Sequence, residues 1–242
     1  KKLRKVWPPS YYWFYKQWQK KAYHLALQLD EKENFDIIHQ LNMVGYREPG
    51  YLWKMKKPFV WGPIGGLENS PWRFLPSLGI KGLIFYTGRN IFNGIQRYFS
   101  KRPKQAAKRN SASLIGATPG NQKMIQELWH RNAEVICEVG QEINNVKIVL
   151  SKRTPTNEPL KIIWSGQHTP GKNLPLLLVA LEKVTIPFEL HILGKGEMTN
   201  NWKKIAQNKG IFNHCIWYGW IERQKAIEIM SSGHVFCITS IS

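Results

Sequence analysis

A lysine at the end of a glycine- and proline-containing turn is the first feature with chemical potential. Residues 162–165 are typical of a buried strand, and Gly166–Lys172 predicts a turn that leads into a helix. Unpaired N–H groups at a helix start attract anions, and Lys172 adds a full charge there. The pattern predicts a diphosphate site formed by Lys172, the turn at Gly166 and the N–H groups of residues 171–173. Taken alone, the segment favours an ordinary strand–turn–helix unit with a solvated lysine.

Short apolar stretches alternate with helix-like segments along the chain. Strands are expected at residues 35–39, 58–61, 113–117, 135–139, 161–165, 188–193, 215–218 and 234–239. Helices are expected at residues 10–33, 42–56, 80–109, from Pro119 onward, and at 172–184, 197–209 and 223–230. This alternation predicts an α/β fold with buried parallel strands. The polar stretch 141–159 is the expected boundary between two domains, 1–140 and 141–242.

Length and composition are those of a globular protein. The 242 residues, 43% of them hydrophobic, suffice for one large domain or two small ones. No apolar run approaches the roughly 20 residues of a membrane-spanning helix, and no signal peptide is visible. The chain starts without Met, which indicates a start within a longer protein. The odd number of cysteines predicts buried, reduced thiols in a cytosolic protein: Cys137, Cys215 and Cys237.

The charge is strongly positive, with a formal net value of +19. Residues 1–140 hold 23 Lys and Arg against 9 Asp and Glu, whereas residues 141–242 hold 12 against 7. Such an excess favours nucleic acid, an acidic membrane surface or phosphorylated substrates as partners. Residues 10–33 combine aromatic residues with lysines, as interfacial helices do. A helix with its aromatic residues in the core and its lysines in solvent is the alternative.

Three segments of the second half resemble the donor-binding domain of family-4 (group 1) glycosyltransferases, which are retaining enzymes of the GT-B fold. Residues 163–173 resemble the family's glycine-arginine-x-x-proline-x-lysine turn, and residues 190–197 its strand ending in glycine-x-glycine. Residues 216–240 resemble its strand–helix–strand that ends near a serine. The resemblance implies a donor-binding role for six residues: Gly166, Gln167, Lys172, Gly194, Gly196 and Ser240. The two glycines of the second segment are also explained by a tight turn alone, and Ser240 by a plain loop.

The first half resembles the family's acceptor domain less closely, through residues 35–39, 58–66 and 135–140. His39 ends the first of these strands and is a candidate catalytic residue; a structural histidine is the alternative. Gly65 and Gly66 match the interdomain loop, although they also suit a simple turn. Arg47 and Glu48 are candidate acceptor-side residues, or else a surface ion pair of little consequence.

The chain also departs from the family pattern. Gln167 replaces the arginine that joins the lysine on the diphosphate; it could bond a phosphate oxygen or cap the turn. The segment 62–66 stands where many members carry a histidine. The family's paired glutamates would follow Ser240, and its first glycine-rich strand would precede Lys1. We therefore expect a fragment that lacks both ends, with two incomplete Rossmann-like domains and little or no activity alone.

The resemblance implies a hexosyltransferase that moves a sugar from a nucleotide-sugar donor to a hydroxyl acceptor with retention, in polysaccharide or glycolipid assembly. Residues 1–140 would form the acceptor side and residues 141–242 the donor side. No metal or other cofactor is expected, because Lys172 and a helix terminus can replace the divalent ion. The location implied is cytoplasmic, peripheral at the inner face of a membrane, with an anionic membrane surface and a lipid-linked acceptor as partners.

Two other functions remain open at this point. A basic nucleic-acid-binding module would explain the charge and the interleaved aromatic residues. The charge is dispersed, however, and no recognition motif is present, so nucleic acid is not the expected partner. An inactive remnant of a glycosyltransferase would explain Gln167.

Overall fold

The computed structural model describes residues 10–41, 43–109, 111–140 and 158–241. Packing divides the chain into two compact units, Lys1–Asn69 with Ile91–Glu142, and Ser70–Asn90 with Ile143–Ser242. The expected boundary stretch 141–159 lies almost entirely outside the described residues. The segment Ser70–Asn90, which the sequence places in the first domain, packs with the second unit.

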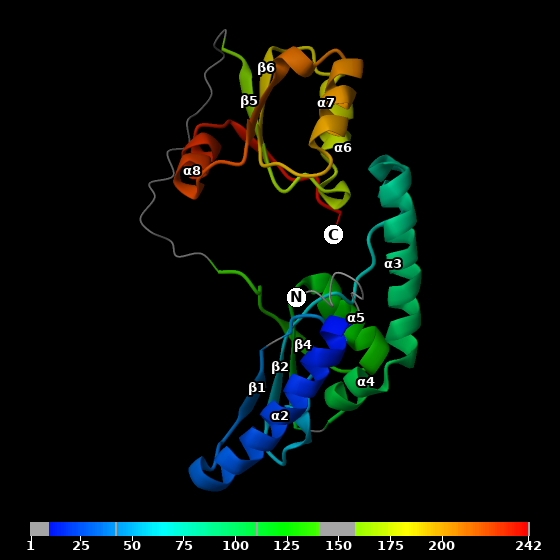
Figure 1. Ribbon diagram of the computed structural model, residues 1–242, viewed down its shortest axis with the longest axis vertical. Coiled ribbons are helices and arrows are strands. Elements are labelled where there is room, and N and C mark those ends of the chain that lie inside the picture. Colours follow the sequence, from blue (N-terminus) through cyan, green and yellow to red (C-terminus); the bar gives the residue numbers. More distant parts are fainter. Residues whose placement is uncertain (1–9, 42, 110, 141–157, 242) are drawn as a thin grey trace. The chain divides into compact units, whose positions relative to one another are not determined.

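The first unit is built on a four-stranded sheet in which all neighbours are parallel (Figure 1). Its strands, in spatial order, are β1 (Ile38–Gln40), β2 (Phe59–Ile64), β3 (Ala112–Gly116) and β4 (Ala133–Val135). Around them lie α2 (Ser10–Glu33), the 3₁₀ turn η1 (Leu52–Lys54), the second part of α3 (Gly79–Phe99), α4 (Lys101–Ala107) and α5 (Pro119–Trp129).

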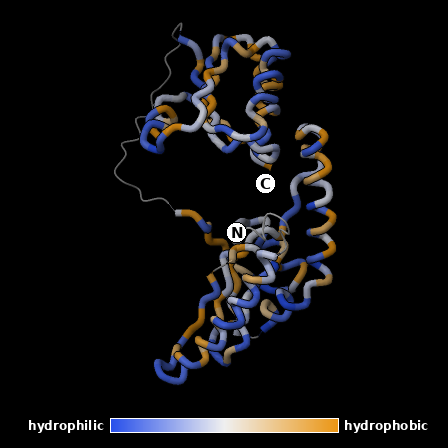
Figure 2. Tube along the Cα trace, viewed as in Figure 1, coloured by the Kyte–Doolittle hydropathy of each residue, from blue (hydrophilic) through white to orange (hydrophobic). Residues whose placement is uncertain are grey.

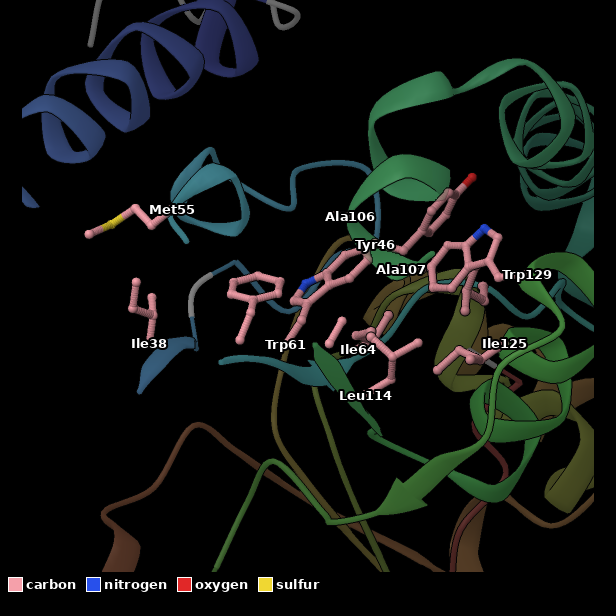
Figure 3. Close-up of a cluster of buried hydrophobic side chains, with 13 residues drawn as sticks. Ile38, Tyr46, Met55, Trp61, Ile64, Ala106, Ala107, Leu114, Ile125 and Trp129 are labelled. Carbon is pink, nitrogen blue, oxygen red and sulfur yellow. The ribbon is translucent and has the colours of Figure 1, made fainter. Parts of the chain in front are cut away.

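The core of the first unit forms between β2, β3 and the helices (Figure 3). Trp61 of β2 and Trp129 of α5 stack with ring centroids 5.3 Å apart, and both are almost fully buried. The expected helix start at Pro119 is confirmed, because the Thr118 side chain accepts a hydrogen bond from the N–H of Asn121.

The second unit contains another parallel four-stranded sheet, in the order β7-β6-β5-β8. The strands are β5 (Leu160–Ser165), β6 (Phe188–Leu193), β7 (Cys215–Gly219) and β8 (Val235–Cys237). In Figure 1, α6 (Leu174–Leu181) and α7 (Thr199–Asn208) lie on one side of the sheet and α8 (Arg223–Ser231) on the other. Three 3₁₀ turns complete the unit: η2 (Trp72–Leu78), η3 (Pro170–Lys172) and η4 (Phe212–His214). The expected α/β class is confirmed.

The order of the second sheet reverses direction at β5. The chain proceeds from β5 to β6 and β7 on one side, and then returns to place β8 on the other side of β5. In open parallel sheets, ligands bind at the carboxyl ends of the strands at such a topological switch point. The turn that follows β5 therefore occupies the position where this fold binds its ligands.

Several expected elements differ in extent. β4 ends at Val135 instead of Val139, because its partner β3 itself ends at Gly116. The thiol of Cys137, which follows β4, is exposed, so the expectation of burial is wrong there. The other two thiols, Cys215 and Cys237, are half-buried, and all three are free.

Other differences concern the segments that surround the expected site. Gly62–Ile64, expected as loop, continues β2. The expected helix 80–109 consists of α3 and α4 with a break at Ser100. The helix expected from Lys172 begins at Leu174, because Asn173 adopts a left-handed conformation (φ 46°) between η3 and α6.

The turn after β5 contains a histidine whose side chain lies in the core of the second unit. His168 is fully buried, and its ring lies 5.5 Å from that of Trp164, 4.9 Å from that of Trp202 and 6.0 Å from that of Trp217. Its Nδ1 lies 2.8 Å from the hydroxyl of Thr199, and its Nε2 has no hydrogen-bond partner among the described residues. The imidazole thus links the turn after β5 to the start of α7.

Burial and, to a smaller extent, the nearby charge of Lys203 lower the pKa of His168 from 6.5 to about 4. The folded protein therefore holds this imidazole neutral under conditions in which the unfolded chain already binds a proton. As the pH falls through 6.5 towards 4, proton uptake by the unfolded state progressively favours unfolding.

We predict that acidification from pH 6.5 to about 4 lowers the free energy of unfolding through His168 by about 3 kcal/mol. His168→Asn keeps a polar atom near the position of Nδ1 but does not titrate. It should therefore lose less stability over this range, although it is less stable at neutral pH. Denaturant unfolding at several pH values measures both proteins. A parallel loss of stability in both would contradict the assignment.

Candidate functional site

Three glycines meet where adjacent strands of the second sheet end. Gly166 follows β5, Gly194 follows β6 and Gly219 ends β7. The N–H of Gly166 donates to Leu193 O (3.1 Å), and the N–H of Gly194 donates to Gly219 O (2.8 Å). Gly194 has φ +110°, and a Cβ there would collide with the carbonyl oxygen of Gly166. This close crossing requires glycine for structural reasons and leaves an edge of the site lined by backbone.

A hollow of about 470 Å³ opens at these strand ends. It is lined by residues that follow β5, β6 and β7: Ser165, Gly166, Gln167, Leu193, Gly194, Lys195, Trp220, Ile221 and Ala226. Three of the six predicted donor-binding residues, Gly166, Gln167 and Gly194, are among them. The lining contains the cation Lys195 and no carboxylate, so its electrostatic character suits an anion.

The turn Gly166–Lys172, next to the hollow, differs from the expected anion site in one respect. The N–H groups of Lys172 and Asn173 donate within η3, to Thr169 O and Pro170 O, both at 3.0 Å. The prediction that these backbone groups are unpaired is therefore wrong. The lysine side chain remains next to the hollow, because a Cβ on Gly166 would lie 3.7 Å from its Cδ. The positive charge that this turn offers to an anion is therefore the ammonium group of Lys172.

The segment after β8 is bonded to the same turn. The hydroxyl of Thr239 accepts from the indole N–H of Trp164 (2.9 Å) and donates to the carbonyl of Lys172 (2.7 Å). The N–H of Ile241 donates to Gly171 O (3.0 Å). Ser240, the exposed residue between Thr239 and Ile241, is thereby held beside the turn.

Gly196 has a different place from the other predicted donor residues. A Cβ there would lie 2.9 Å from the carbonyl carbon of His168, and the N–H of His168 donates to Lys195 O (3.2 Å). Gly196 is thus packed under the turn after β5 and is not part of the lining of the hollow. Its structural explanation is supported by this contact.

The sequence did not predict Trp220 or Thr239 as site residues. Trp220 follows the glycine that ends β7 and is 71% exposed at the hollow. A signal was available, because the end of β7 must lie at the same edge as the ends of β5 and β6. The role of Thr239 depends on β8 pairing with β5, which the order of segments along the chain does not specify.

In the first unit, His39 lies within β1 and its ring is exposed. Its Nε2 is 2.9 Å from the carbonyl of Gly62, which only accepts, so this nitrogen carries the proton. Gly65 forms a parallel bridge with Gly45, and Gly66 follows with φ +77°. The predicted catalytic histidine is thus paired with Val60 of β2, and its ring contacts the cis Gly62–Pro63 peptide that precedes the predicted loop.

Arg47 and Glu48 have separate partners. Arg47 Nη2 donates to Asn93 Oδ1 (2.6 Å), and its Nε donates to Gln96. Glu48 is largely buried and pairs with Arg102 at 3.0 Å. The alternative that the two residues form an exposed ion pair with each other is therefore wrong, and the acceptor-side role stays a prediction.

Within residues 10–41, 43–109, 111–140 and 158–241, no group of three or more His, Cys, Asp or Glu side chains is placed to hold an ion. In those ranges no helix is long and apolar enough to cross a membrane.

Comparisons with known proteins agree with this architecture. The family model described as glycosyl transferases group 1 matches residues 147–242. The lipopolysaccharide outer core galactosyltransferase WaaB in its apo form shares 15% identity and a TM-score of 0.51, over 81% of this chain and 53% of its own. Anabaena Alr3699/HepE in complex with UDP shares 13% identity and a TM-score of 0.56, over 91% of this chain and 57% of its own. HepE in complex with UDP-glucose shares 13% identity and a TM-score of 0.51, over 90% of this chain and 56% of its own.

No curated protein matches the chain. The chain spans just over half the length of the solved structures named above. At such low sequence identity the structural likeness concerns the fold, whereas the family match rests on the sequence of the second unit. Residues 147–242 are therefore similar in sequence to the group 1 glycosyltransferases, and the two parallel α/β units of this chain have the GT-B fold.

Proposed function

We propose that the protein transfers a hexose from a nucleotide-sugar donor to a hydroxyl acceptor with retention of configuration, in polysaccharide or glycolipid assembly. The observation that carries the proposal is the hollow at the ends of β5–β7, next to Lys172 and within the family-matched region. HepE, which shares the fold, has been crystallised with UDP and with UDP-glucose. WaaB is a galactosyltransferase of the lipopolysaccharide outer core.

The difficult step is the departure of the nucleoside diphosphate. The bond between the anomeric carbon and the diphosphate oxygen breaks, and its electron pair leaves negative charge on the phosphate. The acceptor oxygen forms the new bond on the same face and gives its proton to the departing phosphate oxygen. Fixed cations aimed at the developing charge stabilise this transition state. Lys172 and Lys195 are the cations at the hollow, and the exposed Gln167 side chain can donate a hydrogen bond but no charge.

The rest of the hollow suits the nucleoside. The backbone-lined edge at Gly166 and Gly194 allows a ribose or base to approach closely. The exposed ring of Trp220 offers an aromatic face to the base. Ser240 is held within reach of the same turn through Thr239 and Ile241.

We assign the acceptor side to the first unit, which contains Arg47, Glu48, His39 and the Gly65–Gly66 loop. A lipid-linked acceptor and an anionic membrane surface fit the surface of α2. Phe14, Trp18, Leu25 and Leu29 are spaced by four, seven and four residues, so they share one helix face, and all are exposed. The alternative that the aromatic residues of α2 belong to the core is wrong for Phe14 and Trp18, whereas Tyr23 packs against the core of the first unit. Figure 2 shows further hydrophobic segments along α3, where Ile80, Ile84 and Phe99 are exposed.

We predict that UDP and UDP-glucose bind the chain, and that Lys172→Ala weakens binding by about 2 kcal/mol, roughly 30-fold, through loss of a charged contact to phosphate. Gln167→Arg restores a bidentate cation and should tighten binding by about 1 kcal/mol. Isothermal titration calorimetry measures both, and Lys204→Ala, an exposed lysine of α7, is the matched control. Weak UDP binding together with tight, salt-sensitive binding of single-stranded nucleic acid would instead support a nucleic-acid module. Absence of any nucleotide binding would support an inactive remnant.

We also predict that UDP binding needs no divalent cation, because Lys172 and Lys195 supply the positive charge. Calorimetry in the presence of EDTA should give the same dissociation constant as calorimetry with added Mg²⁺ or Mn²⁺. A large gain in affinity with either ion would show that the diphosphate recruits a metal and would contradict this part of the proposal.

A membrane role for α2 predicts that Phe14→Ser combined with Trp18→Ser weakens binding to anionic vesicles by roughly tenfold, since two apolar side chains no longer enter the interface. Vesicle co-sedimentation measures the change. Trp220→Ser, at an exposed tryptophan of the second unit, is the control. Equal losses in both variants would argue against a specific role of α2.

A further inference from the structure

A second hollow, of about 580 Å³, lies in the first unit. Its lining consists of one aromatic residue, one amide and four cationic residues: Trp53, Gln105, Lys101, Lys104, Lys108 and Arg109. The lining contains no acidic residue. The function proposed above makes no use of this cluster.

The pattern of α4 explains why the lysines gather at this hollow. Pro103, Ala106 and Ala107 are buried, and the two alanines belong to the core of the first unit. Lys101, Lys104 and Lys108 are spaced by three and four residues, so they share a solvent-exposed side. A purely solvated helix face would explain these lysines. Lys104 and Lys108 also lie at the carboxyl end of α4, where the helix dipole favours cations, whereas Lys101 is its first residue. It does not explain why a ring and a guanidinium group complete the same hollow.

Hydrogen bonds to backbone carbonyl groups hold Trp53 and Arg109 in place. The indole N–H of Trp53 donates to Gly50 O at 3.1 Å. Arg109 donates through Nη2 to Lys57 O (3.0 Å) and through Nη1 to Trp53 O. Neither side chain must be ordered when a ligand binds, which lowers the entropic cost of binding.

The positive charge of the hollow is not neutralised by ion pairs within the described part of the chain. The partners of Arg109 are carbonyl groups, and Glu48, the carboxylate bonded to α4, is paired with Arg102. The ammonium group of Lys54 adds a further charge, 5.6 Å from the centre of the Trp53 ring. Like charges this close repel one another, and a bound anion removes that repulsion.

The hollow lies at the opposite edge of the first sheet from the predicted loop at Gly65 and Gly66. Lys57 and Arg109 precede β2 and β3, and the N–H of Phe59 donates to Ser111 O (3.0 Å) at the start of these strands. The hollow therefore lies at the amino ends of parallel strands. The predicted loop at Gly65 and Gly66 follows the carboxyl end of β2, where substrates of such folds bind.

We propose that this hollow is a second anion-binding site, which takes a phosphate group carried by a phosphomonoester or phosphodiester. The ammonium groups of Lys101, Lys104 and Lys108 and the guanidinium of Arg109 contact the phosphate oxygens, and the Trp53 ring contacts the apolar part next to them. An anionic phospholipid headgroup and a soluble phosphorylated saccharide share this chemistry. The site acts independently of donor binding.

The test compares two probes on the 242-residue chain. Glucose 1-phosphate and inorganic pyrophosphate, each titrated with saturating UDP so that the hollow at β5–β7 is occupied, represent soluble phosphates. Phosphatidylcholine vesicles with or without phosphatidylglycerol represent a lipid source. Lys104→Glu combined with Lys108→Glu should weaken binding of the preferred probe by roughly 30-fold, since each surface cation contributes about fivefold. Lys183→Glu combined with Lys204→Glu makes the same charge change at exposed positions of the second unit and should have little effect. Circular dichroism and UDP binding confirm that the variants remain folded.

Loss of pyrophosphate and glucose 1-phosphate binding in the α4 variant alone would support a soluble ligand. Loss of phosphatidylglycerol-dependent binding in that variant alone would support a lipid headgroup. Equal losses in the two double variants, binding of neither probe, or tighter binding of nucleic acid than of both would overturn the proposal. Because UDP binding is measured separately, failure of this site is distinguishable from failure of the proposed transferase function.

Discussion

The close crossing of backbone at the ends of β5, β6 and β7 is the constraint on which the site depends. Two hydrogen bonds, Gly166 to Leu193 and Gly194 to Gly219, draw three connecting segments together, and the space between the first two admits no Cβ. A parallel sheet places all three segments at one edge. The hollow is the space that remains outside this crossing, bounded by the exposed Gln167 and Trp220.

Hydrogen bonds also determine which groups of the turn remain for a ligand. The backbone N–H groups of Lys172 and Asn173 are taken up within η3, and the carbonyl of Lys172 accepts from Thr239. The main chain of the turn is thus rigid and largely satisfied, while the lysine side chain remains available. Gln167 stands where the resemblance implies an arginine. A diphosphate at this turn would therefore be stabilised by fewer cations than at a site that has both the arginine and the lysine.

The sequence was sufficient for the parallel α/β fold, because strands buried on both faces are continuous apolar runs; β6 has the predicted bounds, 188–193. It also identified Gly166, Gln167 and Gly194 at the hollow. It missed the helix start at Leu174, since a left-handed asparagine is a single-residue event without periodicity. It missed Thr239 because that contact spans 75 residues to Trp164 and depends on the pairing of β8 with β5. The hollow at Trp53 likewise joins segments far apart in the sequence.

The central claim is that a nucleoside diphosphate binds at the ends of β5–β7. Nuclear magnetic resonance of the ¹⁵N-labelled chain during titration with UDP tests it most directly, because each glycine amide gives its own signal. The account predicts saturable shifts of the amides of Gly166, Gln167, Gly194 and Lys195, together with the indole N–H of Trp220. Shifts confined to the hollow at Trp53, or no saturable shift at all, would contradict it.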